Sequence, residues 1–215
     1  MNNRLKVGVL ISGNGTNLQS LIDATKQVNF PAEIALVISN NPNAFGLSRA
    51  SKANIPIKVI DHNTFEHREA FDRAIDTALK QVGCKMICLA GFMRVLSAHF
   101  VDSWPMKIIN IHPSLLPSFK GINAQKQAIE AGVQVSGCSI HFVTSQLDSG
   151  PIIAQVAIPV LNDDTPKSLS ARILEHENKV YPIALETVAN KLLCRNPSSK
   201  SFNQSEATDS LISIY

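Results

Sequence analysis

Residues 5–17 read LKVGVLISGNGTN, and this stretch decides the predicted fold. Its first part, LKVGVLIS, is a short apolar run typical of a strand that is buried on both faces of a parallel sheet. Leu18, Leu21 and Ile22 then recur at the spacing of a helix. The stretch therefore predicts a strand, a glycine turn and a helix in succession, as in the first unit of a doubly wound α/β fold.

The glycine turn Gly13-Asn14-Gly15-Thr16-Asn17 lies where the predicted helix begins. The first N–H groups of a helix have no partner within it, and the positive end of the helix dipole lies there, so such a turn can bind an anion. Glycine also lets the backbone approach a phosphate closely. The residue order matches neither the dinucleotide fingerprint nor a Walker loop, so it names no ligand. An ordinary tight turn is the alternative interpretation.

Apolar runs and amphipathic segments continue to alternate along the chain, without an internal repeat. Further strands are predicted at 32–40, 55–60, 85–90, 107–111, 135–144 and 151–160, and helices after 41–43, from Thr64 to about Gln81, from Ser97 to about Ser103, after Gly121, and from Thr165 to about Leu193 with a bend near Pro182.

This alternation predicts an α/β fold of the Rossmann-like kind, a mostly parallel twisted sheet with helices on both faces. The strands at 135–144 and 151–160 are joined by so short a turn that they should pair antiparallel at one edge. Three loops, at 13–17, 91–96 and 112–121, each follow a predicted strand. They should therefore converge at the carboxyl edge of the sheet, where ligands bind in such folds.

A second stretch, KIINIHPSLLPSFKG at 107–121, carries the strongest chemical signal. Asn110 and His112 are two residues apart at the end of a predicted strand, so their side chains project from the same face. An amide donor beside a group that can carry a proton near neutral pH suits chemistry in which charge develops on an oxygen. A capping Asn and a loop-closing His are the structural alternative.

Other polar residues have two interpretations each. Asp148 lies in a turn and could be only a turn former. Glu177 interrupts the apolar stripe of the last helix, so it either reaches solvent at the edge of the core or binds a cation. Arg68 falls in the first turn of a helix, where a cation opposes the dipole, which hints at an anionic partner. The apolar loop 91–96 could pack on the core or border a flat heterocycle.

The chain has 215 residues, of which 45% are hydrophobic and 17% charged, and this predicts a single globular domain over 1–194. The polar segment 195–215 is expected to be a flexible tail. A net charge of +3 without a dense basic run argues against nucleic acid and leaves room for a small anionic substrate. Four cysteines without metal-type spacing, no signal peptide and no membrane-spanning run predict a reduced, cytoplasmic protein.

The sequence resembles the phosphoribosylglycinamide formyltransferase family, the folate-dependent enzymes of purine synthesis, from about residue 5 to 190. The motifs that carry the resemblance are VLISGNGTNL, AFGL, REAFDRA, LAGFMRVLS, NIHPSLLPSFKG, HFVTSQLDSGPI and EHENKVYP. The resemblance implies transfer of a formyl group from 10-formyltetrahydrofolate to the amine of 5-phosphoribosylglycinamide (GAR). It implies no metal, and small molecules rather than nucleic acid or membrane as partners of a monomer or homodimer.

The resemblance also implies residue roles. Asn110 would donate to the oxyanion, His112 would supply a proton, and Asp148 would stabilise the imidazolium. The GAR phosphate would lie on the glycine turn, and its amine would lie at Glu177. The full set of GAR contacts would be Gly15, Thr16, Asn17, Leu174, Glu175, His176 and Glu177. The folate would contact Arg68, Met93, Arg94, Val95, Leu96, Asn110, Thr144, Ser145, Gln146, Leu147 and Asp148.

Some features depart from the family, and other functions stay open. Several bacterial relatives carry His where this chain has Asn123, Gln125 and Asn178. Methionyl-tRNA formyltransferase and formyltetrahydrofolate hydrolase share the central motifs. The first normally adds a C-terminal domain and the second an N-terminal one, so we expect neither. A non-catalytic nucleotide-binding module is the alternative outside the enzymes, and the coincidence of Asn110, His112 and Asp148 argues against it.

Overall fold

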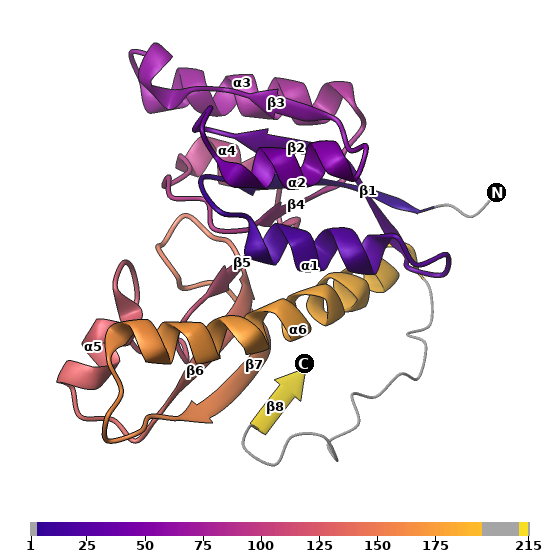
Figure 1. The fold of residues 1–215 in the computed structure, drawn as a ribbon. Coiled ribbons are helices and arrows are strands. Elements are labelled where there is room, and N and C mark those ends of the chain that lie inside the picture. The colour runs from indigo at the N-terminus through magenta and orange to yellow at the C-terminus, as the bar shows by residue number, and fades with distance from the viewer. Residues whose placement is uncertain (1–3, 195–210, 215) are drawn as a thin grey trace.

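In the computed structural model, residues 4–194 and 211–214 are described, and they build an eight-stranded sheet in the order β3-β2-β1-β4-β5-β6-β7-β8 (Figure 1). The strands are β1 (Leu5–Ile11), β2 (Ala32–Ser39), β3 (Ile57–Val59), β4 (Met86–Leu89), β5 (Ile108–His112), β6 (Val135–Phe142), β7 (Ile152–Pro159) and β8 (Leu211–Ile214). The helices are α1 (Thr16–Thr25), α2 (Phe45–Lys52), α3 (Arg68–Gln81), α4 (Ala98–Asp102), α5 (Ala124–Glu130) and α6 (Pro166–Leu192).

The sheet has a parallel part and an antiparallel part. Strands β3, β2, β1, β4 and β5 pair parallel to one another. Strands β6, β7 and β8 then continue the sheet with antiparallel pairing. The predicted Rossmann-like α/β fold with an antiparallel edge is confirmed.

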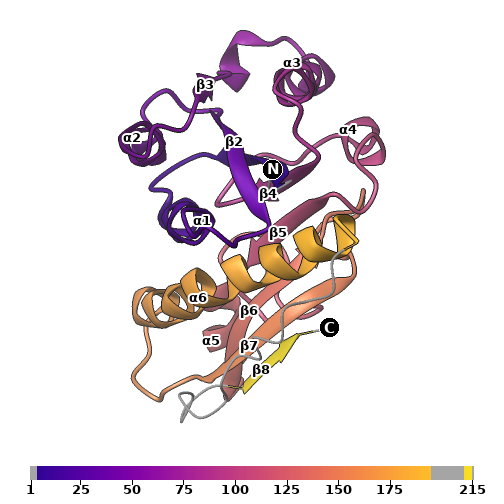
Figure 2. The ribbon, with the colours of Figure 1, turned by 90° about the vertical axis from the view of Figure 1, so that its right-hand side faces the viewer.

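Helices cover both faces, because successive side chains of a buried strand point to opposite sides. In β1, Val7, Val9 and Ile11 join one core cluster, to which α1, α2 and α6 contribute. Leu10 points the other way, into a second cluster with residues of α3 and α4. Figure 2 shows α1 and α2 on the opposite side of the sheet from α3 and α4. This two-sided burial explains the near-continuous apolar runs of the central strands.

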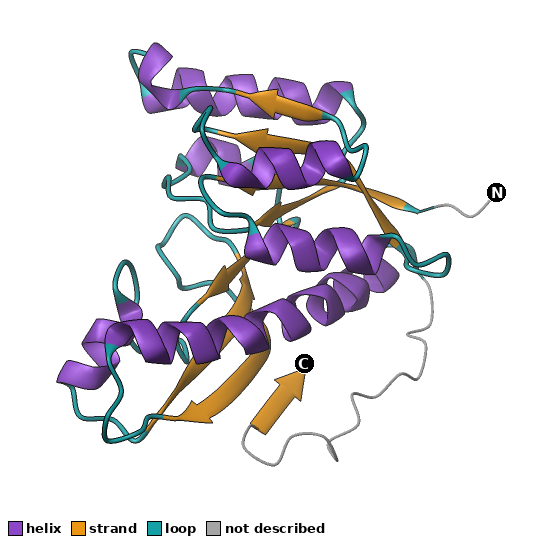
Figure 3. Ribbon diagram, viewed as in Figure 1, coloured by secondary structure: helices purple, strands orange, loops and turns teal. Residues whose placement is uncertain are grey.

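The loops after β1, β4 and β5 lie on the same side of the molecule, at the left of Figure 3. Two of these loops are bonded directly, since the Ser12 N–H donates to the Gly91 carbonyl over 3.1 Å. The carboxyl edge of the sheet thus gathers the loops that the sequence marks as functional.

One predicted helix boundary is wrong. Thr64 does not cap α3; it ends a short 3₁₀ turn, His62–Thr64, in which its hydroxyl donates to the Asp61 carbonyl. The chain is then extended at His67, and α3 begins at Arg68. Its end at Gln81 is as predicted, and α6 runs as one helix through Pro182.

Residues 211–214, which belong to the segment expected to be a flexible tail, form β8 and pair with β7. Residues 195–210 and 215, the rest of that prediction, lie outside the described residues. In the part of the chain that is described, no helix is long and apolar enough to cross a membrane.

Candidate active site

A cluster of polar side chains lies where β5 pairs with β6; His112, His141 and Asp148 are buried and Asn110 is half-buried. Asn110 and His141 are direct partners across the two strands, and the Asn110 Nδ2 lies 3.3 Å from the His141 Nε2. Asp148, from the loop after β6, lies between two imidazoles. Its Oδ2 is 3.4 Å from the His112 Nδ1, and its Oδ1 is 3.7 Å from the His141 Nε2. The three predicted catalytic residues, Asn110, His112 and Asp148, therefore meet in one cluster.

His112 is held at both ring nitrogens. Its Nε2 donates to the Phe119 carbonyl over 2.9 Å, while its Nδ1 faces the Asp148 carboxylate. A carbonyl and a carboxylate are both acceptors, so the ring can donate from each nitrogen only as the imidazolium. The carboxylate also accepts a hydrogen bond of 2.9 Å from the Gly121 N–H, which ties the loop before α5 to the loop after β6.

His141 belongs to the same cluster, although the sequence analysis did not single it out. It is only 2% exposed, and its Nδ1 lies 2.9 Å from the Phe142 carbonyl. Burial lowers the pKa of His141, while the Phe142 carbonyl and the Asp148 carboxylate act in the opposite direction. In its neutral form, with Nδ1 donating, His141 presents the Nε2 lone pair to the Asn110 amide. His141 can therefore orient that amide.

Ser139, a fully buried residue of β6, holds the loop after β5 by hydrogen bonds. The Ser139 hydroxyl donates to the Ser114 carbonyl and accepts from the Leu116 N–H, over 2.7 and 3.0 Å. The Gln155 amide of β7 donates to the same hydroxyl over 2.9 Å. The antiparallel strands thus position the loop that carries Phe119.

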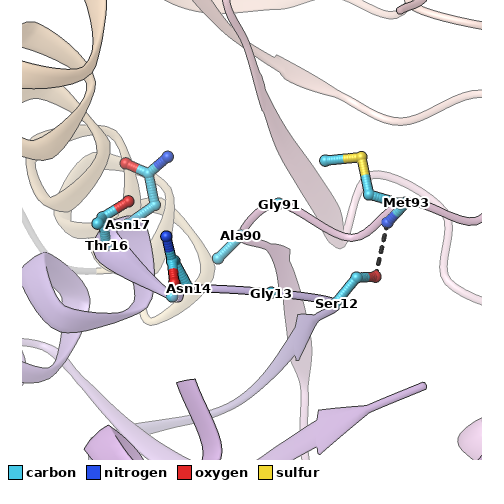
Figure 4. Close-up of a pocket in the computed structure, with 9 residues that line it drawn as sticks. Ser12, Gly13, Asn14, Thr16, Asn17, Ala90, Gly91 and Met93 are labelled. Atoms are coloured by element: carbon cyan, nitrogen blue, oxygen red, sulfur yellow. Dashed lines mark hydrogen bonds between the residues drawn. The ribbon is translucent and has the colours of Figure 1, made fainter. Parts of the chain in front are cut away.

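A cavity of about 230 Å³ lies over the glycine turn, between the start of α1 and the loop after β4 (Figure 4). The Ser12 hydroxyl accepts a hydrogen bond of 2.8 Å from the Met93 N–H and so joins its two walls. The cavity is lined by Ser12, Gly13, Asn14, Gly15, Thr16, Asn17, Ala90, Gly91 and Met93. These include the three glycine-turn residues that the sequence predicts to hold a phosphate.

Glu177 lies beside this cavity. The Asn17 Nδ2 donates to the Glu177 Oε2 over 2.8 Å, which links α1 to α6. Burial raises the pKa of the Glu177 carboxyl, and the Asn17 hydrogen bond opposes the shift. The Asn17 Oδ1 is buried and has no hydrogen-bond partner among the described residues. Buried polar atoms normally have partners, so this oxygen and the carboxylate suit a ligand with donors.

The cluster of Asn110, His112 and Asp148 does not line the cavity but lies next to it. Asn110 on β5 is the register partner of Leu89 on β4, and the next residue of that strand end, Ala90, lines the cavity. Neighbouring strands are about 4.8 Å apart, so a ligand seated on the glycine turn could reach Asn110. One small molecule could therefore contact both regions.

The predicted folate residues of the loop after β4 are not all alike. Met93, Arg94 and Val95 are exposed beside the cavity. Leu96 is 8% exposed and belongs to the core cluster with α3 and α4. It therefore anchors the loop.

Arg68, the first residue of α3, is exposed. Phe71, one turn further along that helix, stacks on Phe92 with ring centroids 6.4 Å apart. This contact places the start of α3 beside the loop after β4.

The remaining predicted contacts differ in exposure. Ser145, Gln146 and Leu147 are exposed in the loop that ends at Asp148, and Thr144 is half-buried. On α6, Leu174 and His176 are half-buried, and Glu175 is exposed, unlike the buried Glu177 two residues later. In residues 4–194 and 211–214, no group of His, Cys, Asp and Glu side chains is arranged to hold a metal ion.

The fold and the buried polar cluster together define an α/β enzyme that acts on small molecules at the carboxyl edge of its sheet. Comparison with known proteins identifies the family of this enzyme. The formyl transferase family model matches residues 5–185, and the chain belongs to this family.

Named relatives agree with this assignment. The chain is 40% identical to phosphoribosylglycinamide formyltransferase of Escherichia coli, over 86% of this chain and 88% of that protein. It is 53% identical to the trifunctional purine biosynthetic protein adenosine-3 of Gallus gallus, over 87% of this chain but only 19% of that protein. The crystal structure of glycinamide ribonucleotide transformylase 1 from Symbiobacterium toebii superposes with a TM-score of 0.86 at 44% identity, covering 89% of this chain and 90% of that one.

Proposed function

We propose that the protein transfers the formyl group of 10-formyltetrahydrofolate to the amine of GAR, a step of purine synthesis. One observation carries the proposal: the cluster of half-buried Asn110 with buried His112 and Asp148 adjoins the cavity over the glycine turn. The likeness to the Escherichia coli formyltransferase over most of both chains supports this choice of substrates. Both are water-soluble metabolites, in keeping with the cytoplasmic location expected from the sequence.

In the proposed reaction the amine nitrogen of GAR attacks the formyl carbon. This carbon becomes tetrahedral, and its carbonyl oxygen becomes an oxyanion. The new C–N bond then remains, while the bond from that carbon to N10 of the folate breaks. The attacking nitrogen loses one proton and N10 gains one, so formyl-GAR and tetrahydrofolate form without an oxidant or reductant. The folate is thus a co-substrate that carries the one-carbon unit.

The cluster supplies what this intermediate needs. The Asn110 amide has two N–H groups; one faces His141, and the second can donate to the oxyanion. His112, held beside the Asp148 carboxylate, would act as the acid. Its Nε2 proton is held by the Phe119 carbonyl, so the loop after β5 must release that bond when the imidazolium donates elsewhere.

The substrates would occupy the two sides of the cluster. The GAR phosphate would lie on Gly15, Thr16 and Asn17, and its amine side near Glu177, with residues 174–176 bordering it. The folate ring would lie against residues 93–96 and 144–148, with Arg68 at the far end of the folate. The exposed apolar side chains of Met93, Val95 and Leu147 support this assignment, because they offer flat apolar area around the cluster.

The proposal is tested by supplying 10-formyltetrahydrofolate with three competing acceptors: GAR, methionyl-tRNA and water. We expect formyl-GAR as the main product and only slow hydrolysis without GAR. Formylation of the tRNA alone, or hydrolysis at the same rate with and without GAR, would overturn the proposal and favour one of the alternatives named above.

A further inference from the structure

The glycine turn is held from outside by α2. The Gly46 N–H at the start of this helix donates to the Gly13 carbonyl over 3.0 Å. One turn later, the Arg49 Nε donates to the Asn14 carbonyl over 2.9 Å. Both carbonyls at the apex of the turn are therefore bound by α2.

The packing here is close. A Cβ added to Gly15 would lie 2.7 Å from the Gly46 Cα, so the turn and the helix touch backbone to backbone. Only glycine fits at this contact, and Gly15 also has a φ of +68°. The turn consequently has one side against α2 and the other toward the cavity that Asn14 and Gly15 line.

These two hydrogen bonds fix the direction of two peptide groups. In a trans peptide the N–H points opposite to the carbonyl of the same unit. Because the Gly13 and Asn14 carbonyls face α2, the N–H groups of Asn14 and Gly15 face away from it. Neither N–H donates to any described residue. The side of the turn away from α2 therefore presents two free donors.

The cavity contains no cationic side chain among its lining residues, which are neutral throughout. An anion there would meet only uncharged donors: backbone N–H groups, side-chain amides and hydroxyls. Arg49 is a cation one peptide away, half-buried and fixed by three contacts. Besides the Asn14 carbonyl, its guanidinium lies 5.0 Å from the Phe45 ring centre and 3.4 Å from the Gln19 Oε1. Donation to the carbonyl polarises the peptide and strengthens its N–H as a donor.

We infer that Arg49 is a positioning residue for the acceptor's phosphate: through the Asn14 carbonyl it orients the Asn14–Gly15 peptide so that the Gly15 N–H faces the phosphate. Arg49 itself does not touch the ligand. This inference rests on the proposed function for the identity of the phosphate ester, and it assigns a role to α2 that the catalytic cluster does not require.

The test compares Arg49→Met with Lys52→Met, which removes an exposed cation from the same helix without a contact to the turn. Two acceptors are used: GAR and its dephosphorylated form, glycinamide riboside. We expect Arg49→Met to raise KM for GAR about 10-fold with kcat within about 2-fold, as for loss of a charged hydrogen-bond partner. KM for the riboside should stay unchanged, and so should both KM values in Lys52→Met.

Arg49→Lys keeps the charge and one donor, so it should recover most of the affinity for GAR. Equal losses for both acceptors, or the same loss in Lys52→Met, would overturn the inference. If Arg49→Met does not fold, Arg49→Gln, which keeps a polar side chain without the charge, decides. A raised KM for GAR with an unchanged KM for the riboside would support the inference, while unchanged KM values for both acceptors would refute it.

Titration with inorganic phosphate, followed at the Gly15 amide resonance, separates this inference from the proposed function. A wild-type protein that binds phosphate at Gly15, more tightly than Arg49→Met does, supports the positioning role even if GAR is not formylated. A wild-type protein that formylates GAR but shows no response of this resonance to phosphate contradicts the positioning role alone.

Discussion

The two regions proposed to bind and convert the substrates are built in different ways. At the glycine turn, on the parallel half of the sheet, the groups offered to a ligand are mostly backbone N–H donors, directed by the packing of α1 and α2. At the ends of β5 and β6, where the sheet turns antiparallel, the working groups are side chains that hold one another. The first region depends on backbone shape, and the second on the identity of a few side chains.

This difference predicts which measured property a substitution in each region should change. A side chain of the cluster can be removed with little change in the backbone, so its loss should appear in the rate. A change at the glycine turn alters the backbone itself, so it should appear in stability and in affinity for the acceptor. Single substitutions in each region, taken in order of decreasing effect, test this division.

The largest effect is expected from His112→Ala. Loss of a general acid typically lowers the rate by about 10²–10⁴-fold, and we expect kcat for formyl transfer to fall within that range. KM for GAR should change by less than about 3-fold, because the glycine turn is intact. Steady-state kinetics measures both values. His99→Ala, which removes an exposed imidazole from α4, is the control and should behave as wild type. A kcat near the wild-type value would remove His112 from the mechanism.

Asn110→Ala should have the next largest effect on the rate. Removal of one oxyanion donor costs about 10²–10³ in kcat. Because Asn110 also faces the buried His141, the fold should lose only the stability of one hydrogen bond, about 1 kcal/mol. Single-turnover kinetics together with denaturant unfolding separates the two effects. A variant that loses stability but keeps its rate would show that Asn110 only fills space beside His141.

The sequence predicts the cluster in part. Asn110 and His112 follow from the period of two in a strand, and the structure places both at the end of β5. Asp148 could not be told from a turn former without the family resemblance, because its contact with His112 depends on how a loop folds back. His141 was missed because its role depends on the register between β5 and β6, and no local pattern states a register.

The sequence predicts the presence of helices and strands more reliably than the residues at which they begin and end. Two-sided burial makes β4 and most of β1 and β2 apolar, so these strands are visible in the sequence. The start of α3 was wrong because the Thr64 hydroxyl bonds backward to Asp61, and both cap-type and turn-type bonds use the same residues. The strand β8 was missed because its partner β7 lies far back in the sequence, before α6, and no local pattern shows a pairing at that separation.

At the glycine turn, Gly15→Ala should act on stability. Its positive φ costs an L residue about 1–2 kcal/mol, and the added methyl would lie 2.7 Å from the Gly46 Cα. We expect the free energy of unfolding to fall by about 2–4 kcal/mol in denaturant unfolding. Gly13→Ala is a matched control, because a Cβ there meets nothing within 4 Å. Equal losses in the two variants would mean that contact with α2 does not shape the turn.

Glu177→Gln should have opposite effects on stability and on binding. Burial raises the pKa of Glu177 in the folded protein, so its contribution to stability falls as pH rises above the unfolded value of 4.5. At pH 8 the substitution should therefore raise the free energy of unfolding, with no gain at pH 4. Affinity for GAR should fall in kinetic assays. Glu175→Gln, exposed on the same helix, should change neither quantity; a Glu177→Gln variant with unchanged stability at pH 8 would contradict the assignment.

The smallest effect is expected at His141. This residue is a side chain of the cluster, but its substitution should act on stability, as substitutions at the glycine turn do. Burial lowers its pKa in the folded protein below the ordinary value of 6.5. The unfolded chain then binds more protons at mildly acid pH, so this contribution is complete above about pH 6.5 and is lost as pH falls below it. The free energy of unfolding of the wild type should fall between pH 7.5 and 5.5, and should fall less in His141→Gln. Denaturant unfolding at both pH values measures this, with the exposed His67→Gln as control. Equal losses of stability in wild type and His141→Gln would place the acid sensitivity elsewhere in the molecule. An imidazole that gained a proton between pH 7.5 and 5.5 could not hold the Asn110 amide in one orientation across that pH range.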